Sequence, residues 1–68
     1  MTLREVMQAM RYNDIVTVAN WPSGEIYIDR ETVATACWNR EFEKLMKRDV
    51  MILSVGREAH DMIIEIRN

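Results

Sequence analysis

The stretch that decides the fold is residues 2–29, TLREVMQAMRYNDIVTVANWPSGEIYID, in which a helix-sized amphipathic start runs into a β-hairpin pattern. Thr2 followed three residues later by Glu5 matches a capping box, in which each side chain bonds a free backbone N–H at a helix start. Apolar side chains then recur at the spacing of one helical stripe, and they are Leu3, Val6, Met7 and Met10. The sequence therefore predicts a helix that begins at Thr2 and packs on a sheet.

A β-hairpin is expected next. Residues 15–19 are apolar and largely β-branched, residues 25–29 alternate in polarity, and the loop between them holds Pro22 and Gly24. Because successive side chains of a strand point to opposite faces, we expect one set to lie over the first helix and Tyr27 to lie on the other face. The set expected over the helix is Val16, Val18, Ile26 and Ile28.

The next segment, residues 30–38, fits two structures. The alternation of Val33, Thr35 and Cys37 is typical of a strand, whereas the alanines between them also suit a helix. A second helix is expected from Asn39 to about residue 47, and Trp38 is a candidate hydrophobic staple at its entry. The side chains expected to point inward from this helix are Phe42, Leu45 and Met46.

A second hairpin closes the chain, with strands at residues 50–55 and 62–66 and a turn at 56–59. The sequence thus predicts a single α+β domain over residues 1–68, in the order α-β-β-α-β-β. An antiparallel sheet of about four strands would carry two short helices. Both faces of this sheet contain apolar residues, and those expected on the less covered face are Ile15, Tyr27, Ile52 and Ile63. Two small helices are too few to cover both faces, which predicts a homo-oligomer.

Composition excludes several classes of protein. Cys37 is the only cysteine of the 68 residues, so no disulfide framework exists, and Cys37 with His60 gives too few soft ligands for a closed zinc site. We therefore expect no metal and no cofactor. No apolar run approaches the roughly 18 residues of a membrane span, and the single thiol suits the cytoplasm. A net charge of −2 argues against general nucleic-acid binding.

Four basic residues of the expected helix at 39–48 share one of its faces. Their spacing of i, i+4, i+7 and i+8 places all four on one side of a helix. Such a face would hold phosphate, nucleic acid or an acidic protein surface. The alternative is a solvated face whose last two cations complement the helix dipole. The four residues are Arg40, Lys44, Lys47 and Arg48.

Trp21 is the other candidate contact, because it lies at the expected tip of the first hairpin. Tryptophan is enriched among binding hot spots, although Trp21 can equally fold back on its own sheet beside Pro22. A stacking platform for a nucleotide base needs a second aromatic ring, for which Tyr27 and Tyr12 are the candidates.

No catalytic residues are predicted. His60 and Asp61 are adjacent on an expected strand, so their side chains point to opposite faces. Cys37 has no histidine near it in the sequence and is expected to be a small core residue, and the methionines are expected to fill the core. The sequence therefore indicates a binding protein and not an enzyme.

Three segments carry a resemblance, and they are TLREV at 2–6, DIVTV at 14–18 and MIIEI at 62–66. With these, the chain resembles short accessory proteins of uncharacterised function encoded by phages and prophages of Firmicutes. It departs from them at residues 31–38, where the similar proteins are shorter. The resemblance brings no functional residues with it.

This resemblance implies an anti-defence role in the host cytoplasm. Such a protein would act by blocking a host defence protein or by sequestering a nucleotide signal. In the second mode, phosphates would lie on Arg40, Lys44 or Arg48 and the base on Trp21 or Tyr27. The alternatives are a homo-oligomeric interaction module without a ligand and a nucleic-acid binder that uses the basic helix at 39–48.

Overall fold

The computed structural model describes residues 1–56, 58 and 61–67. The predicted α+β class and the order α-β-β-α-β-β are confirmed, with two short 3-10 helices (η1 and η2) after the second α-helix. The elements are α1 (Leu3–Gln8), β1 (Ile15–Trp21), β2 (Ile26–Thr32), α2 (Val33–Trp38), η1 (Arg40–Phe42), η2 (Leu45–Lys47), β3 (Val50–Val55) and β4 (Asp61–Arg67). The expected turn at 56–59 and the expectations for His60 fall partly or wholly outside the described residues.

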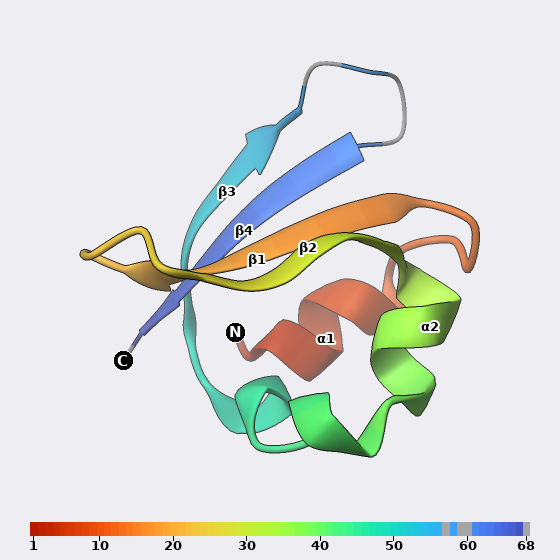
Figure 1. Ribbon diagram of the computed structural model, residues 1–68, viewed down its shortest axis with the longest axis horizontal. Helices are drawn as coiled ribbons and strands as arrows, with labels where there is room; N and C mark the ends of the chain where they lie inside the picture. The colour runs from red at the N-terminus through yellow and green to blue at the C-terminus, as the bar shows by residue number, and fades with distance from the viewer. Residues whose placement is uncertain (57, 59–60, 68) are drawn as a thin grey trace.

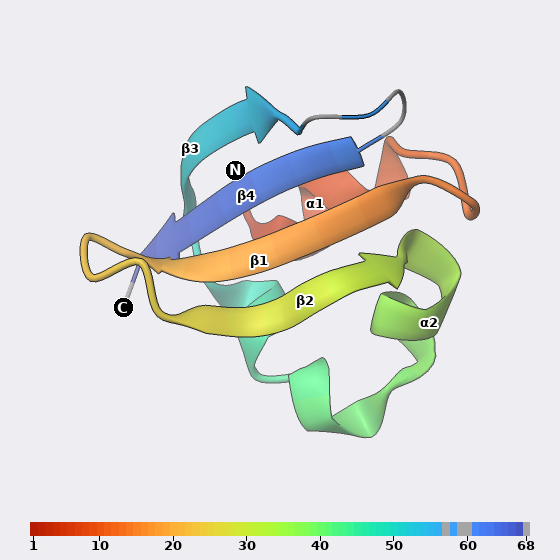
Figure 2. The same ribbon diagram turned by 45° about the horizontal axis from the view of Figure 1, so that its top comes forward.

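The four strands form one mixed sheet in the order β2-β1-β4-β3 (Figure 2). Each hairpin is antiparallel, but β1 and β4 run parallel, from the pair Ile15 and Asp61 to the pair Trp21 and Arg67. The prediction of an antiparallel sheet was therefore wrong for this central pair. Alternating polarity is the same for a strand read in either direction, so it does not determine how two hairpins join.

The helices all lie on one face of the sheet (Figure 1). The predicted capping box of α1 is present, because the Thr2 N–H donates to Glu5 Oε1 at 2.9 Å and the Glu5 N–H donates to Thr2 Oγ1 at 3.3 Å. These bonds from the Thr2 backbone and side chain lower the pKa of Glu5. The stripe of α1 is buried in a core that consists of Leu3, Val6, Met7, Val16, Val18, Ile28, Val33, Ala36, Leu45, Met46, Ile64 and Ile66.

β2 does not follow simple alternation. Its register against β1 shifts on both sides of the pair Val18 and Ile28, as at β-bulges. Ile26 pairs with Ala19 and is 56% exposed, so its predicted place over α1 was wrong. Tyr27 packs against the core, so its predicted place on the opposite face was also wrong. Both errors have one cause, since an extra residue moves the side chains beyond it to the other face.

Residues 30–38 contain the end of β2 and then α2. The Thr32 hydroxyl caps this helix by accepting the Thr35 N–H at 3.2 Å. Of the six residues of α2, only Val33 and Ala36 are buried. Cys37 is exposed, so its predicted place in the core was wrong. Trp38, expected as a staple, is also exposed.

The expected continuous helix from Asn39 was wrong, because η1 and η2 are separate turns. Their backbone bonds join residues three apart, as from the Phe42 N–H to the Asn39 carbonyl at 3.1 Å and from the Arg48 N–H to the Leu45 carbonyl at 3.1 Å. The inward positions were right, since Leu45 and Met46 are buried and Phe42 is partly buried. The predicted basic stripe of one regular helix does not form.

The other face of the sheet carries no helix among the described elements (Figures 1 and 2). Ile52 and Ile63 are exposed there, as the surplus of apolar residues predicted. Arg30 spans β1 on this face, because its Nη1 lies 2.6 Å from Asp61 Oδ2 on β4 and its Nη2 lies 3.7 Å from Glu58 Oε2. This ion pair ties the edge strand β2 to the centre of the sheet.

Candidate binding groove between α1 and α2

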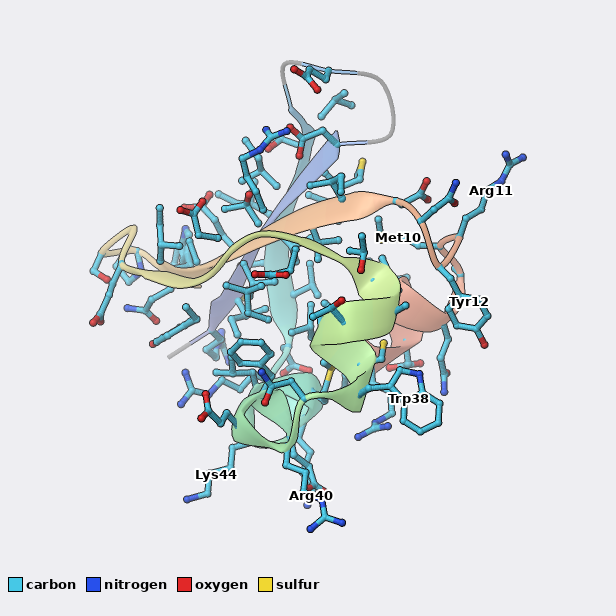
Figure 3. All side chains as sticks on the ribbon, turned by 45° about the vertical axis from the view of Figure 1, so that its right-hand side comes forward. Met10, Arg11, Tyr12, Trp38, Arg40 and Lys44 are labelled. Carbon is cyan, nitrogen blue, oxygen red and sulfur yellow. The ribbon has the colours of Figure 1, made fainter. Side chains whose placement is uncertain are left out.

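An apolar groove with a volume of about 500 Å³ lies beside α1 and α2. Its deepest side chains are buried and come from three elements, and they are Met7, Val33 and Met46. Trp38 and Tyr12 line it as well, and Figure 3 shows both rings projecting on the same side of the molecule. We call this site the Trp38 groove, and its lining residues are Arg4, Met7, Gln8, Met10, Tyr12, Val33, Cys37, Trp38 and Met46.

Two backbone bonds hold the loop after α1 against the start of α2. The Val33 N–H donates to the Asp14 carbonyl at 2.9 Å, and the Ala34 N–H donates to the Tyr12 carbonyl at 3.1 Å. These N–H groups belong to the first turn of α2, where no partner exists within the helix. The bonds therefore satisfy the helix start and fix the backbone from which the Tyr12 side chain projects.

Trp38 is placed by the end of α2. The helix stops there because Asn39 has extended backbone angles and caps the following 3-10 turn, its Oδ1 accepting the Glu41 N–H at 3.0 Å. Trp38 is thus the last helical residue and is 84% exposed, while Tyr12 is 75% exposed. Large apolar side chains that stay in water beside a hollow are typical of contact surfaces.

One end of the Trp38 groove is polar and cationic. A smaller hollow of about 240 Å³ shares Arg4 and Trp38 with the groove and adds Asn39, Arg40 and Glu43. In the part of the chain that the structure describes, Arg4, Arg40 and Lys44 make no ion pair within 4.0 Å. Figure 3 shows Arg40 and Lys44 projecting outward below Trp38. Of the described residues lining this end, Glu43 alone is acidic.

Sulfur atoms line the floor. Cys37 Sγ lies 3.8 Å from Met7 Sδ, and Met46 and Met10 add two more thioethers. Thioether side chains are polarisable and adapt their shape, which is why methionine is common on surfaces that accept different partners. The floor therefore suits an inserted apolar side chain.

The six residues that the sequence singled out do not form one site. Arg48 lies with Tyr27, its Cζ 5.4 Å from the ring centroid and its Nη1 donating to the Tyr27 hydroxyl at 3.2 Å. Arg40 alone of the six lines the hollows beside Trp38. Lys44 and Lys47 are exposed on the 3-10 segment, and Trp21 ends β1 opposite Arg67. The structure thus joins one predicted pair and separates the rest.

Sequence reasoning missed Arg4, Met10 and Trp38 as contact residues and treated Tyr12 only as a partner for Trp21. One signal was present: Tyr12 and Trp38 each precede an asparagine, a residue that favours turns and helix boundaries, and Tyr12 lies in the loop between α1 and β1 whereas Trp38 ends α2. An aromatic residue at such a position does not belong to the apolar stripe of a helix or strand, so the periodicity of the sequence does not show whether it is buried.

The described residues hold neither a metal-ligand cluster nor a membrane-spanning helix. No group of three or more His, Cys, Asp or Glu side chains that could hold a metal ion occurs among them. None of the helices they form is long and apolar enough to cross a membrane. Comparison of the chain with family models, with curated proteins and with solved structures finds no match.

Proposed function

We propose that this chain is a non-enzymatic binding protein that holds a segment of another protein in the Trp38 groove. The segment carries one large apolar side chain, which enters between Trp38 and Tyr12, and acidic residues beside it, which meet Arg4 and Arg40. Blocking a host defence protein in the cytoplasm, one of the two roles that the resemblance implies, is the form of this activity that we propose.

The exposure of Trp38 and Tyr12 over a methionine floor carries the proposal. Tryptophan, tyrosine, methionine and arginine are the residues enriched in protein interfaces, and all four line this groove. Hot spots need an apolar anchor that is fully desolvated on binding, and a hollow of about 500 Å³ has room for such a side chain.

Charge favours an acidic partner. Arg4 and Arg40 line the polar end without ion pairs among the described residues, so a carboxylate arriving there gains charge-assisted hydrogen bonds without breaking existing ones. The net charge of −2 opposes a polyanionic nucleic acid as a whole, whereas a short acidic segment meets only this local cationic end.

The lining residues support binding in preference to catalysis. Among the described residues, the nine that line the Trp38 groove include no carboxylate or imidazole that could act as a general base, and Glu43 lines only the smaller hollow at its polar end. The Cys37 thiol contacts the Met7 thioether, which does not take up a proton and so does not activate this thiol as a nucleophile.

Fluorescence anisotropy with labelled amphipathic peptides tests the proposal. One peptide carries a central Leu flanked by Glu, and its control has Lys at each Glu. We expect the acidic peptide to bind and the basic one not to bind, with affinity that falls as salt screens the charges. The proposal fails if neither peptide binds, or if AMP or a short oligonucleotide binds the groove and the acidic peptide does not.

Charge reversal locates the contact. Arg4→Glu combined with Arg40→Glu should weaken acidic-peptide binding at least tenfold, since two charge-assisted contacts become repulsive. Lys47→Glu is the matched control, because this exposed lysine lines neither hollow and should change affinity less than twofold. Equal effects of the two changes would contradict the assignment of Arg4 and Arg40.

A further inference from the structure

The two edges of the sheet differ in how well they are protected. β2 carries Asp29, Arg30 and Glu31 and is interrupted by two register shifts. β3 has the sequence VMILSV over Val50–Val55, without a charged residue. Charges and bulges are the devices by which edge strands avoid pairing with another chain. β2 has both, whereas β3 has one bulge at its start and no charge.

Backbone pairing shows which part of β3 remains free. The Gly56 N–H donates to the Asp61 carbonyl at 2.6 Å, so in an antiparallel ladder Ser54 and Ile52 also bond toward β4. The N–H and C=O groups of Leu53 and Val55 therefore point away from the sheet. This direction is set by the backbone and does not depend on the side chains.

The beginning of β3 is already occupied. The Val50 N–H donates to the Met1 carbonyl at 2.7 Å, and the Leu3 N–H donates to the Arg48 carbonyl at 3.0 Å. Residues 1–3 thus close the edge at 48–50. The open edge therefore lies beyond the bulge at Met51, where Leu53 and Val55 carry the outward backbone groups.

This open edge is also apolar on the helix side. Leu53 is 50% exposed and Val55 is 75% exposed, because α1 does not reach across β3. Another hollow of about 500 Å³ lies between Leu53 and α1, and its apolar lining includes Val6, Met10 and Met62. In Figure 1, β3 runs away from the helical layer at this point. Among the described residues, no helix covers Leu53 and Val55 where their backbone groups point away from the sheet.

We infer that β3 pairs antiparallel with β3 of a second copy of this chain, which joins the two four-stranded sheets into one of eight strands. A twofold axis at Leu53 places this residue opposite itself and Met51 opposite Val55. Residues that face each other across such a pair lie on the same face, so Leu53 meets Leu53 on the helix side.

A second copy fits this edge for a reason of charge. A twofold axis places identical segments together, so any charged residue near the axis would face a like charge. Residues 50–55 carry none, so nothing in β3 opposes its own copy. The inference does not depend on the proposed function, because in Figure 1 α2 and β3 lie on opposite sides of α1, and pairing leaves both Trp38 grooves accessible.

Light scattering with size exclusion tests the inference on the wild-type chain. At roughly 100 μM, a concentration at which even a micromolar interface is saturated, we expect about 16 kDa, twice the 8.1 kDa of one chain. Leu53→Lys should give the monomer mass, because it places a charge beside its own copy. Ile26→Lys, at a similarly exposed site on the bulged edge, should keep the dimer. A wild-type monomer, or a dimer that persists in Leu53→Lys, overturns the inference.

Cross-linking tests the register and does not depend on the folding of the lysine variants. In a Cys37→Ser background, Leu53→Cys should form a disulfide-linked dimer on mild oxidation, because residues that exchange hydrogen bonds across antiparallel strands have Cα atoms about 5.5 Å apart. Ile26→Cys in the same background is the control and should stay monomeric on denaturing gels. Linkage through residue 26 and not through residue 53 would overturn the register. Peptide binding at Trp38 is measured separately, so failure of either proposal leaves the other interpretable.

Discussion

Replacing Trp38 with alanine should separate binding from stability. A fully buried tryptophan removes up to about 250 Å² from water, so a ring that is 84% exposed buries only about 40 Å² in the free protein. At about 25 cal/mol per Å², its loss costs about 1 kcal/mol of folding free energy. For a domain of this size that lowers the melting temperature by about 4–8 °C. Truncation of a hot spot, in contrast, costs at least about 2 kcal/mol of binding, or roughly 30-fold in Kd.

Trp21 provides the matched comparison. It is 36% exposed, so the same arithmetic gives about 160 Å² of buried surface and about 4 kcal/mol. Since that approaches the whole stability of roughly 3–5 kcal/mol expected for so small a core, Trp21→Ala should unfold the chain. Trp21→Phe keeps a ring and should stay folded with unchanged peptide affinity.

Thermal melts followed by circular dichroism and anisotropy with the acidic peptide measure both quantities on the same samples. Trp38→Ala should melt within several degrees of wild type and should lose affinity for the acidic peptide. A folded Trp38→Ala protein with wild-type affinity would refute this prediction. So would a loss of affinity in a folded Trp21→Phe protein that matched the loss in Trp38→Ala.

Three further changes probe the fold by thermal or urea unfolding. Gly56→Ala should cost about 1–3 kcal/mol, because the new Cβ would lie 2.5 Å from Asp61 Cγ, and an unchanged melting temperature would contradict this packing. Arg30→Ala should cost about 1.5–3 kcal/mol of folding free energy, because the buried Asp61 loses its partner at 2.6 Å, and the value should lie toward the lower end since Arg30 is half exposed. Restored stability on adding Asp61→Asn would support this cause. An Arg30→Ala protein as stable as wild type would exclude it. The hydrogen bonds from Thr2 lower the pKa of Glu5 in the folded protein. The Glu5 carboxylate therefore stabilises the fold fully above its unfolded pKa near 4.5, and this stabilisation is lost as the pH falls through the lower pKa of the folded state. Glu5→Gln should remove this part of the acid dependence, and an identical pH profile would contradict it.

The first half of the fold was predictable because its signals are local. The capping box at Thr2 and Glu5 and the stripe of α1 depend on residues three and four apart, and the structure confirms both. What failed depends on contacts between distant segments. Neither the parallel pairing of β1 with β4 nor the bulges that turn Tyr27 inward are encoded in a period of two.

The site was less predictable than the fold. The basic stripe assumed 3.6 residues per turn from Asn39 onward, whereas the backbone makes two 3-10 turns there, which sends Arg48 to Tyr27 and Arg40 toward Trp38. Trp38 itself could not be assigned because residues 30–38 fitted a strand and a helix equally well. Its exposure follows only once α2 is known to end at that residue.

Methyl NMR of methionine tests most directly whether the Trp38 groove is the contact surface. Met7 and Met46 form its floor, while Met51 lies on β3 and Met62 lines the hollow beside Leu53. With 13C-methyl methionine, titration of the acidic peptide should shift the Met7 and Met46 methyl resonances and leave those of Met51 and Met62 unchanged. Shifts confined to Met51 and Met62, or no shift at saturating peptide, would contradict the assignment of binding to the Trp38 groove.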